Sequence, residues 1–345
     1  MRLIHLLVPA ALLAIGLPAS AQGHGLDIYF VDTEGGQATL IVTPGHESIL
    51  IDSGNPGTRD AGRIFQVATK VAGLKQIDNV VATHWHNDHY GGIGELAKLM
   101  PVKRFFDHGI PEKSIDDPTN FPTLIAAYKE ASHGASTAIG PGKNISLKQG
   151  KGAAPVRITT LVGMQNTISE RPGAVPNPFA AEFVEHPKDE SDNANSLGFL
   201  LQFGNWRFLD LGDLTWNIEE KLVAPTDKIG KIDLYLTTHH GLEISNNPVL
   251  LKTVHPTVAI FNNGPRKGGH PDVTQALRGL SSVRAIWQLH RNMTCPPEMN
   301  TSKDKIANWD ESCAGEFIKV SVASDGKSYT VQIGDHGTAQ KYATK

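Results

Sequence analysis

Cysteine is scarce in this chain, with only Cys295 and Cys313 among 345 residues. Two thiols exclude a zinc site built from cysteine alone and a small scaffold that depends on several disulfides. In an oxidising compartment, an even count at short spacing predicts one disulfide, which would close the loop that holds residues 300–309. Such a bond would contribute about 3 kcal/mol in the chain-entropy model. Two free buried thiols are the alternative.

Long apolar runs are also lacking, except near the N-terminus. Residues 6–17 are apolar, follow Arg2, and precede the Ala-Ser-Ala triplet at 19–21, which is typical of a signal-peptidase site. The run contains Pro9 and is shorter than the ~20 residues that a spanning helix needs, which disfavours a membrane anchor. We therefore expect residues 1–21 to be a signal peptide, the protein to be secreted or periplasmic, and the mature chain to have no membrane span.

An excess of positive charge is absent as well. The chain has 32 lysine and arginine residues against 35 aspartate and glutamate residues, a formal net charge of -3. Removal of residues 1–21 would take away one charged side chain, Arg2, and change -3 to -4. An acidic protein lacks the basic surface that binds phosphates of nucleic acids, so nucleic acid is not an expected partner.

Short strands and helices alternate along the first part of the chain. Residues 27–31, 38–42 and 48–52 predict strands joined by tight turns. Apolar positions between 60 and 74 then recur at helical spacing, ahead of an apolar run at 80–82. Strand, helix and strand with apolar cores predict a sheet covered by helices.

The second half repeats this order and suggests a duplication. Its expected strands lie at 197–203, 206–211, 234–237, 258–261 and in a final hairpin around 325–326, and its expected helices follow 217 and 271. An Ile-Asp pair stands seven residues before His84 and again seven before His239, and threonine precedes both histidines. We expect one domain over residues 22–345, in which each half delivers a strand ending in Thr-His to the same cleft.

Residues 109–194 interrupt the pattern and predict a long insertion. The helix and strand-like pieces expected within it lie at 123–131, 145–147 and 156–161. Segment 165–191 predicts a long surface loop, and such loops in compact domains are often functional. Its Phe179, Phe183 and Val184 could cover a cleft.

The densest group of chemically versatile residues is the run 83–89, which reads Thr-His-Trp-His-Asn-Asp-His. Imidazole and carboxylate are ligands that zinc accepts besides thiolate. His84 and His86 point the same way from an extended segment, whereas Asp88 and His89 fall on the following turn and can face a second ion. A polar surface turn is the alternative, but this density favours a metal site at the end of a strand.

The run resembles the His-x-His-x-Asp-His signature of the metallo-β-lactamase superfamily. Over roughly residues 26–290 the sequence is most similar to the soluble hydrolase domain of ComEC-type competence proteins and their secreted free-standing relatives. The matching motifs are a Gly-rich turn after Val31, Asp52-Ser53-Gly54, Gly212-Asp213 and His239-His240-Gly241. This resemblance implies an α/β fold, a four-layer αββα sandwich.

The resemblance also implies two bound zinc ions. The ligands that it implies are His84, His86, Asp88, His89, Asp213 and His239. Asp213 would bridge both ions, because two nearby cations need a shared anion; capping a helix near Trp216 is the alternative.

His239 is preferred to His240 as a ligand because of its internal match to His84. His240 would then support the ligands or protonate the leaving group, and the reverse assignment remains open. Asp88 and His240 are the residues that we expect to act in catalysis. Asp52 resembles the family's buried acid, which orients a ligand loop through hydrogen bonds.

One departure from the family pattern concerns the first metal. Many members have a histidine four residues before the serine that matches Ser196, and this chain has Asp192 there. Asp192 or Asn195 could bind the ion, water could fill the position, or His108 or His186 could substitute. Oxygen ligands would favour manganese at this site.

The implied activity is hydrolysis by a metal-bound hydroxide, because two metals lower the pKa of a shared water toward ~7. The expected substrate is a small molecule or polymer with a phosphodiester or other ester bond. The alternatives are a lactonase or β-lactamase, and a metal-binding or polymer-binding protein without turnover. A turn with Arg266, Lys267 and His270 could receive an anionic group, although a solvated basic loop is the simpler interpretation.

Overall fold

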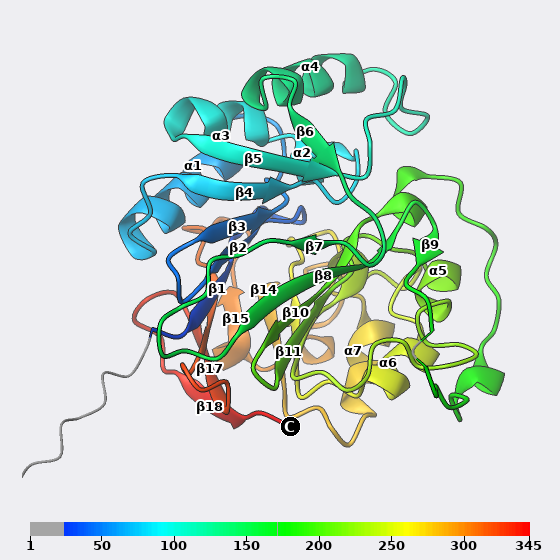
Figure 1. Ribbon diagram of the computed structural model, residues 1–345. Coiled ribbons are helices and arrows are strands. Elements are labelled where there is room, and N and C mark those ends of the chain that lie inside the picture. The colour runs from blue at the N-terminus through cyan, green and yellow to red at the C-terminus, as the bar shows by residue number, and fades with distance from the viewer. Residues whose placement is uncertain (1–23, 171) are drawn as a thin grey trace, which may run out of the picture.

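The computed structural model describes residues 24–170 and 172–345 (Figure 1). The expected signal peptide, residues 1–21, lies outside the described residues. Within these ranges, no helix is long and apolar enough to cross a membrane.

Two nine-stranded sheets form the centre of the molecule. The first runs in the order β18 (Gln340–Ala343), β17 (Ser328–Ile333), β16 (Ile318–Val322), β1 (Leu26–Phe30), β2 (Thr39–Val42), β3 (Ser48–Ile51), β4 (Ile77–Val81), β5 (Val102–Asp107) and β6 (Ser136–Ala138). The second runs in the order β15 (Ile306–Asn308), β14 (Ala285–His290), β13 (Val258–Phe261), β12 (Leu234–Leu236), β11 (Trp206–Asp210), β10 (Gly198–Phe203), β8 (Val156–Gly163) and β7 (Asn144–Ile145), while β9 (Asn166–Thr167) pairs with β8.

Helices lie on the outer face of each sheet (Figure 1). Those beside the first sheet are α1 (Thr58–Gln66), continued by a π-helical turn at Val67–Val71, α2 (Asn87–Tyr90), α3 (Ile93–Leu99) and α4 (Phe121–Ala131). Those beside the second are α5 (Trp216–Glu220), α6 (Pro248–Val254) and α7 (Pro271–Arg278). Short 3-10 turns occupy Ala180–Glu182, Asp192–Asn195, Thr238–Gly241, Pro297–Met299 and Lys303–Lys305.

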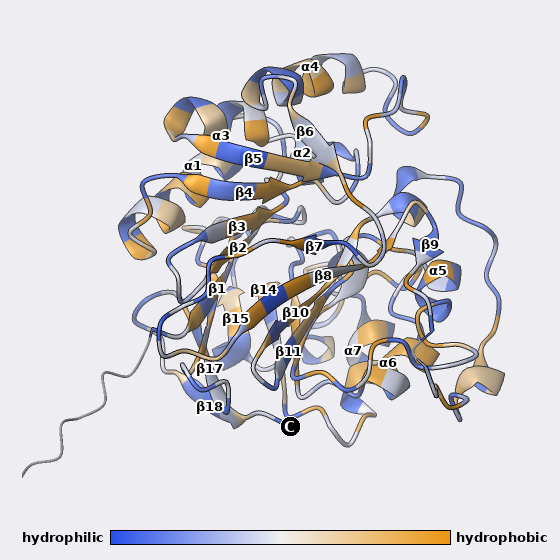
Figure 2. Cartoon of the chain, in the orientation of Figure 1, coloured by the Kyte–Doolittle hydropathy of each residue, from blue (hydrophilic) through white to orange (hydrophobic). Residues whose placement is uncertain are grey.

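Alternating side chains along each strand build three apolar layers. On β1, Ile28 packs between the two sheets, whereas its neighbour Tyr29 packs under the helices of the first sheet, where Ile64 of α1 also lies. On β11, Phe208 faces the space between the sheets and Leu209 faces α6. This period-two pattern leaves both faces of the strands hydrophobic. Hydrophobic residues accordingly colour much of the central strands in Figure 2. The four-layer αββα sandwich expected from the sequence is confirmed.

The insertion at residues 109–194 contributes more strands to the two sheets than the sequence predicts. Strand β6 extends the first sheet, and β7, β8 and β9 extend the second. Helix α6 and strand β14 were not predicted. The strand is buried along its whole length, and its run Ala-Ile-Trp-Gln-Leu-His has neither the alternation nor the uniform apolarity that signals a strand.

The predicted disulfide is wrong, because Cys295 and Cys313 are both free. The Sγ of Cys295 lies 3.6 Å from the carbonyl oxygen of Asn292. The Sγ of Cys313 lies 3.6 Å from Oδ2 of Asp32 instead. The two thiols therefore pack against polar groups of different segments.

Candidate metal centre

Both halves of the chain deliver a strand to one cleft, as the repeated spacing predicts. Strand β4 runs parallel to β3 and leads into Thr83, whose carbonyl oxygen accepts a hydrogen bond from the Leu197 amide at 2.9 Å. Strand β12 runs parallel to β11 and leads into His239, whose amide donates to the Gly212 carbonyl at 2.9 Å. The Thr-His ends of the two strands thus meet at the junction of the sheets.

Four side chains there can each offer one ligand atom, and these atoms all lie within 4.8 Å of one another: Asp88, His89, Asp213 and His240. Nε2 of His89 lies 3.1 Å and Nε2 of His240 lies 3.2 Å from Oδ2 of Asp213. Nε2 of His240 is also 3.4 Å from Oδ2 of Asp88. We call these four residues the ligand cluster.

The ligand cluster fits a divalent cation. His89, Asp213 and His240 are buried. Among the described residues, Nε2 of both histidines and Oδ1 of Asp213 have no hydrogen-bond partner. Buried polar atoms without partners destabilise a fold, and a cation would satisfy all three.

Asp52 holds His89 in the orientation that ligation needs. Its Oδ2 accepts hydrogen bonds from Nδ1 of His89 and from the Thr83 hydroxyl, both at 2.7 Å. Its Oδ1 accepts from the Thr83 amide at 2.7 Å. A carboxylate on Nδ1 keeps the proton there and leaves Nε2 as the ligand atom. This is the orienting role expected of Asp52.

His84 and His86 lie beside the ligand cluster. Their ring centroids are 4.7 Å apart, and the His84 ring is 4.1 Å from that of His89. Nε2 of His84 is buried without a hydrogen-bond partner among the described residues, and burial together with the charge of His89 lowers its pKa well below the usual value. His84 therefore presents a neutral imidazole. His86 is partly exposed, and its Nε2 lies 3.2 Å from Oδ2 of Asp116.

Asp192, expected near the first metal, lies against the His-rich run without joining the ligand cluster. Its Oδ2 accepts from the Trp85 amide at 2.7 Å and lies 3.2 Å from Nε2 of His108, while its Oδ1 accepts from Nδ2 of Asn195 at 3.0 Å. Both carboxylate oxygens thus have partners. His186, the other suggested substitute, stacks on Trp216.

The structure brings His240, rather than His239, into the ligand cluster. Nε2 of His239 lies 3.4 Å from Oδ2 of Asp213 and 3.5 Å from Nδ2 of Asn193. Strand β12 ends at Leu236, and both histidines then adopt left-handed backbone angles with φ of 55°. The repeated spacing would predict the same side-chain direction for His84 and His239 only if both segments were extended. The segment after β12 turns instead, and the turn directs His240 inward.

Asp210 is a functional candidate that the sequence did not single out, and Lys267 lies closer to the centre than its basic turn indicated. Nζ of Lys267 lies 2.5 Å from Oδ2 of Asp88, across 179 residues of sequence. Its only sequence signal is membership of a basic turn. Asp210 is buried, accepts hydrogen bonds from Nε2 of Gln37 at 3.1 and 3.2 Å, and has its pKa raised by burial to about 7.

A second group of metal-capable side chains, Asp32, His290 and Cys313, lies apart from the ligand cluster. Nε2 of His290 is 2.7 Å from Oδ1 of Asp32, and Arg63 donates to Oδ2 of the same carboxylate at 2.9 Å. The guanidinium already neutralises this acid, so the group links the loop after β1 to the end of β14 and to α1.

Comparison with known proteins agrees with this centre. The family model of the Metallo-beta-lactamase superfamily matches residues 31–143. ComE operon protein 3 from Bacillus subtilis (strain 168) is 23% identical over 75% of this chain and 31% of its own length. A UPF0173 metal-dependent hydrolase from Anaeromyxobacter sp. (strain K) is 25% identical over 73% of this chain and 82% of its own.

Shorter and structural matches were also found. An atrochrysone carboxyl ACP thioesterase from Passalora fulva is 35% identical over 66 residues, 19% of each chain. The chain thus spans a third or less of the length of the first of these relatives. The structure of metallo-β-lactamase SMB-1 bound to 2-mercaptoethanesulfonate aligns with a TM-score of 0.39 and 15% identity, over 63% of this chain and 78% of that one.

The family match and the ligand cluster together make this chain similar to the metal-dependent hydrolases. The chain is similar to the metallo-β-lactamase superfamily, whose family model matches residues 31–143.

Proposed function

We propose that this protein is an exported hydrolase that uses two divalent metal ions, zinc at one site and zinc or manganese at the other, to cleave phosphodiesters. The observation that carries the proposal is the ligand cluster next to His84. In the described part of the chain, Nε2 of His89, Nε2 of His240 and Oδ1 of Asp213 are buried without a hydrogen-bond partner. Export rests on the sequence pattern of residues 1–21 alone.

The residues divide into two groups around a shared acid. His89, His240 and Asp88 would hold one ion, and His84 and His86 would hold the other, with Asp213 between them. Asp192 would fill the remaining position at the ion held by His84 and His86. When bound, two such ions would activate a water molecule as the nucleophile and polarise the scissile ester.

Lys267 supports an anionic substrate. Its ammonium group lies on Asp88 at 2.5 Å, and its side chain is 41% exposed, so it faces both the centre and solvent. A cation at this point can bind a nonbridging oxygen of a phosphodiester, which carries one negative charge, better than it can bind a neutral lactone.

His239 is unsuited to protonate a leaving group. Burial lowers its pKa to about 4, so its ring is neutral at pH 7. We therefore assign it the task of holding the cleft together through Asp213 and Asn193, and we assign ligation to His240.

A substrate panel tests this proposal on protein whose metal content has been measured by elemental analysis. The panel contains bis(4-nitrophenyl) phosphate, a chromogenic lactone, a cephalosporin and an acyl thioester. We expect about two equivalents of metal and fastest turnover of the phosphodiester. Faster cleavage of another class would reassign the substrate, and active protein without bound transition metal would falsify the two-metal mechanism.

A further inference from the structure

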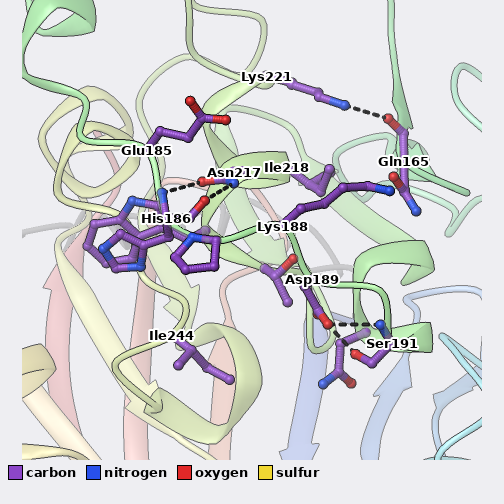
Figure 3. Close-up of a pocket in the computed structure, with 14 residues that line it drawn as sticks. Gln165, Glu185, His186, Lys188, Asp189, Ser191, Asn217, Ile218, Lys221 and Ile244 are labelled. Carbon is purple, nitrogen blue, oxygen red and sulfur yellow. Dashed lines mark hydrogen bonds between the residues drawn. The ribbon is translucent and has the colours of Figure 1, made fainter. Parts of the chain in front are cut away.

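A pocket of about 560 Å³ opens between segment 185–191 and helix α5 (Figure 3). Its lining includes Asn193, whose Nδ2 is 3.5 Å from Nε2 of His239, and Thr215, which follows Asp213 by two residues. The pocket therefore adjoins the metal centre. Its volume lies within the range of sites that enclose small molecules, roughly 300–1,000 Å³.

One wall of the pocket is aromatic and aliphatic. The rings of His186 and Trp216 stack with centroids 4.0 Å apart and planes 5° apart. Ile218 and Ile244 also line the space, and the Ile244 carbonyl accepts a hydrogen bond from the Trp216 amide at 3.2 Å. Ile244 is 48% exposed, which is high for a large apolar side chain next to an aromatic surface. Such a surface gains free energy when a flat apolar group covers it.

The charges that line the pocket balance one another. Two lysines, Lys188 and Lys221, are matched by two acids, Glu185 and Asp189. Nζ of Lys188 pairs with Glu190 at 2.7 Å, and Asp189 accepts hydrogen bonds from the amide and hydroxyl of Ser191 at 2.9 Å. This balance favours an uncharged occupant, because neither sign of charge dominates.

Hydrogen bonds to α5 hold the pocket open in advance. Asn217 accepts from the His186 amide at 3.0 Å and donates to the His186 carbonyl at 2.7 Å, as Figure 3 shows. Nε1 of Trp216 donates to the Val184 carbonyl at 2.9 Å. A preformed pocket loses little conformational entropy when it binds a ligand.

We propose that this pocket binds an uncharged, aromatic substituent of the substrate, next to the bond that is cleaved. This proposal rests on the proposed function. The expected substrates are phosphodiesters whose uncleaved ester group carries an aromatic ring. The anionic phosphoryl group would lie at the metal centre and the ring against Trp216 and Ile244.

Binding of uncleavable probes tests the pocket independently of turnover. Methyl(phenyl)phosphinate and dimethylphosphinate carry the same charge and contain no ester bond, so they report binding alone. With metal-loaded protein, calorimetry should show the phenyl probe binding about 10- to 100-fold more tightly, as expected for burial of one ring. Equal affinities would overturn the proposal.

Two substitutions test whether the pocket causes the preference for the phenyl probe. Trp216→Leu and Ile244→Asn should each remove most of the preference for the phenyl probe. Ile244→Asn alters an exposed side chain, so it should disturb packing less than Trp216→Leu. Val175→Ala is the control, since Val175 is an apolar side chain that is 74% exposed, lies in segment 165–191 and does not line the pocket. A preference that survives in both pocket variants, or that falls equally in the control, would contradict the assignment.

Turnover separates this inference from the proposed function. Bis(4-nitrophenyl) phosphate and methyl 4-nitrophenyl phosphate share one leaving group and differ in the ester that remains. We expect kcat/KM to favour the diaryl substrate by about 10-fold or more, beyond a statistical factor of about two, and Trp216→Leu to reduce this ratio mainly through KM. If neither ester is cleaved while the phenyl probe still binds preferentially, phosphodiester hydrolysis fails and the aromatic pocket stands. Equal kcat/KM values for the two esters would refute the pocket.

Discussion

Asp52→Asn isolates the contribution of one buried hydrogen-bond acceptor to the metal centre. The backbone at Asp52 has φ of 62°, a left-handed conformation that asparagine tolerates well, so the change should leave the chain path intact. The new amide group must face either the Thr83 amide or Nδ1 of His89, and both are donors in the native arrangement. One donor therefore loses its acceptor.

The magnitude follows from these contacts. A buried donor left without a partner costs about 1–3 kcal/mol of unfolding free energy. If the amide instead faces His89, the ring must move its proton to Nε2 and can no longer ligate through that atom. Loss of such a supporting contact typically weakens metal binding by about 10- to 100-fold.

Chelator competition and urea unfolding measure the two effects separately. Asp78→Asn is a matched control, because Oδ2 of Asp78 accepts from the amide and hydroxyl of Ser48 at 3.0 and 3.1 Å, and Oδ1 accepts from Gln76 at 2.6 Å. Asp78 lies at the opposite end of β4 from the His-rich run. Unchanged metal affinity in Asp52→Asn, or an equal loss in the control, would refute the reasoning.

Three further predictions address other parts of the molecule. His240→Ala should release about one equivalent of metal while His239→Ala retains it, and elemental analysis showing the reverse would restore the ligand assignment favoured by the internal repeat. Glu219 is buried with its pKa raised from 4.5 to about 7 by burial, so the folded state keeps a proton that the unfolded chain loses. The contribution of Glu219 to the unfolding free energy should therefore be largest below about pH 4.5 and fall by roughly 3 kcal/mol as the pH rises through 7. Glu219→Gln should lack this component in urea titrations, and equal pH slopes would contradict it. Denatured, unreduced protein should bind two equivalents of thiol reagent, at Cys295 and Cys313, and mass spectrometry that finds none would favour the disulfide.

Local patterns carried most of the information about the fold. Strand β13 (Val258–Phe261) lies where its apolar run predicts, and α4 (Phe121–Ala131) lies where a helix is expected at 123–131. These elements obey the sequence because periodic burial on one or two faces is a property of neighbouring residues. Strand β14 escaped detection because its polar Gln288 and His290 are buried through contacts with distant segments.

The residues of the candidate site likewise include some that the sequence brings together and others that only the fold brings together. Sequence alone determined that His84, His86, Asp88 and His89 lie together, because six residues after a strand cannot separate far. It also determined that a second Thr-His step would reach the same cleft, because both halves share one order of strands.

Only the tertiary structure decided which residues lie in the ligand cluster. The choice of His240 over His239 depends on two left-handed residues after β12, and backbone reversals of that kind leave no periodic signal. The contact between Lys267 and Asp88 joins residues 179 positions apart, and the free thiols depend on where two separate loops pack. Contacts of this range arise from the way the two sheets pack together, and neither partner's neighbours in sequence specify them.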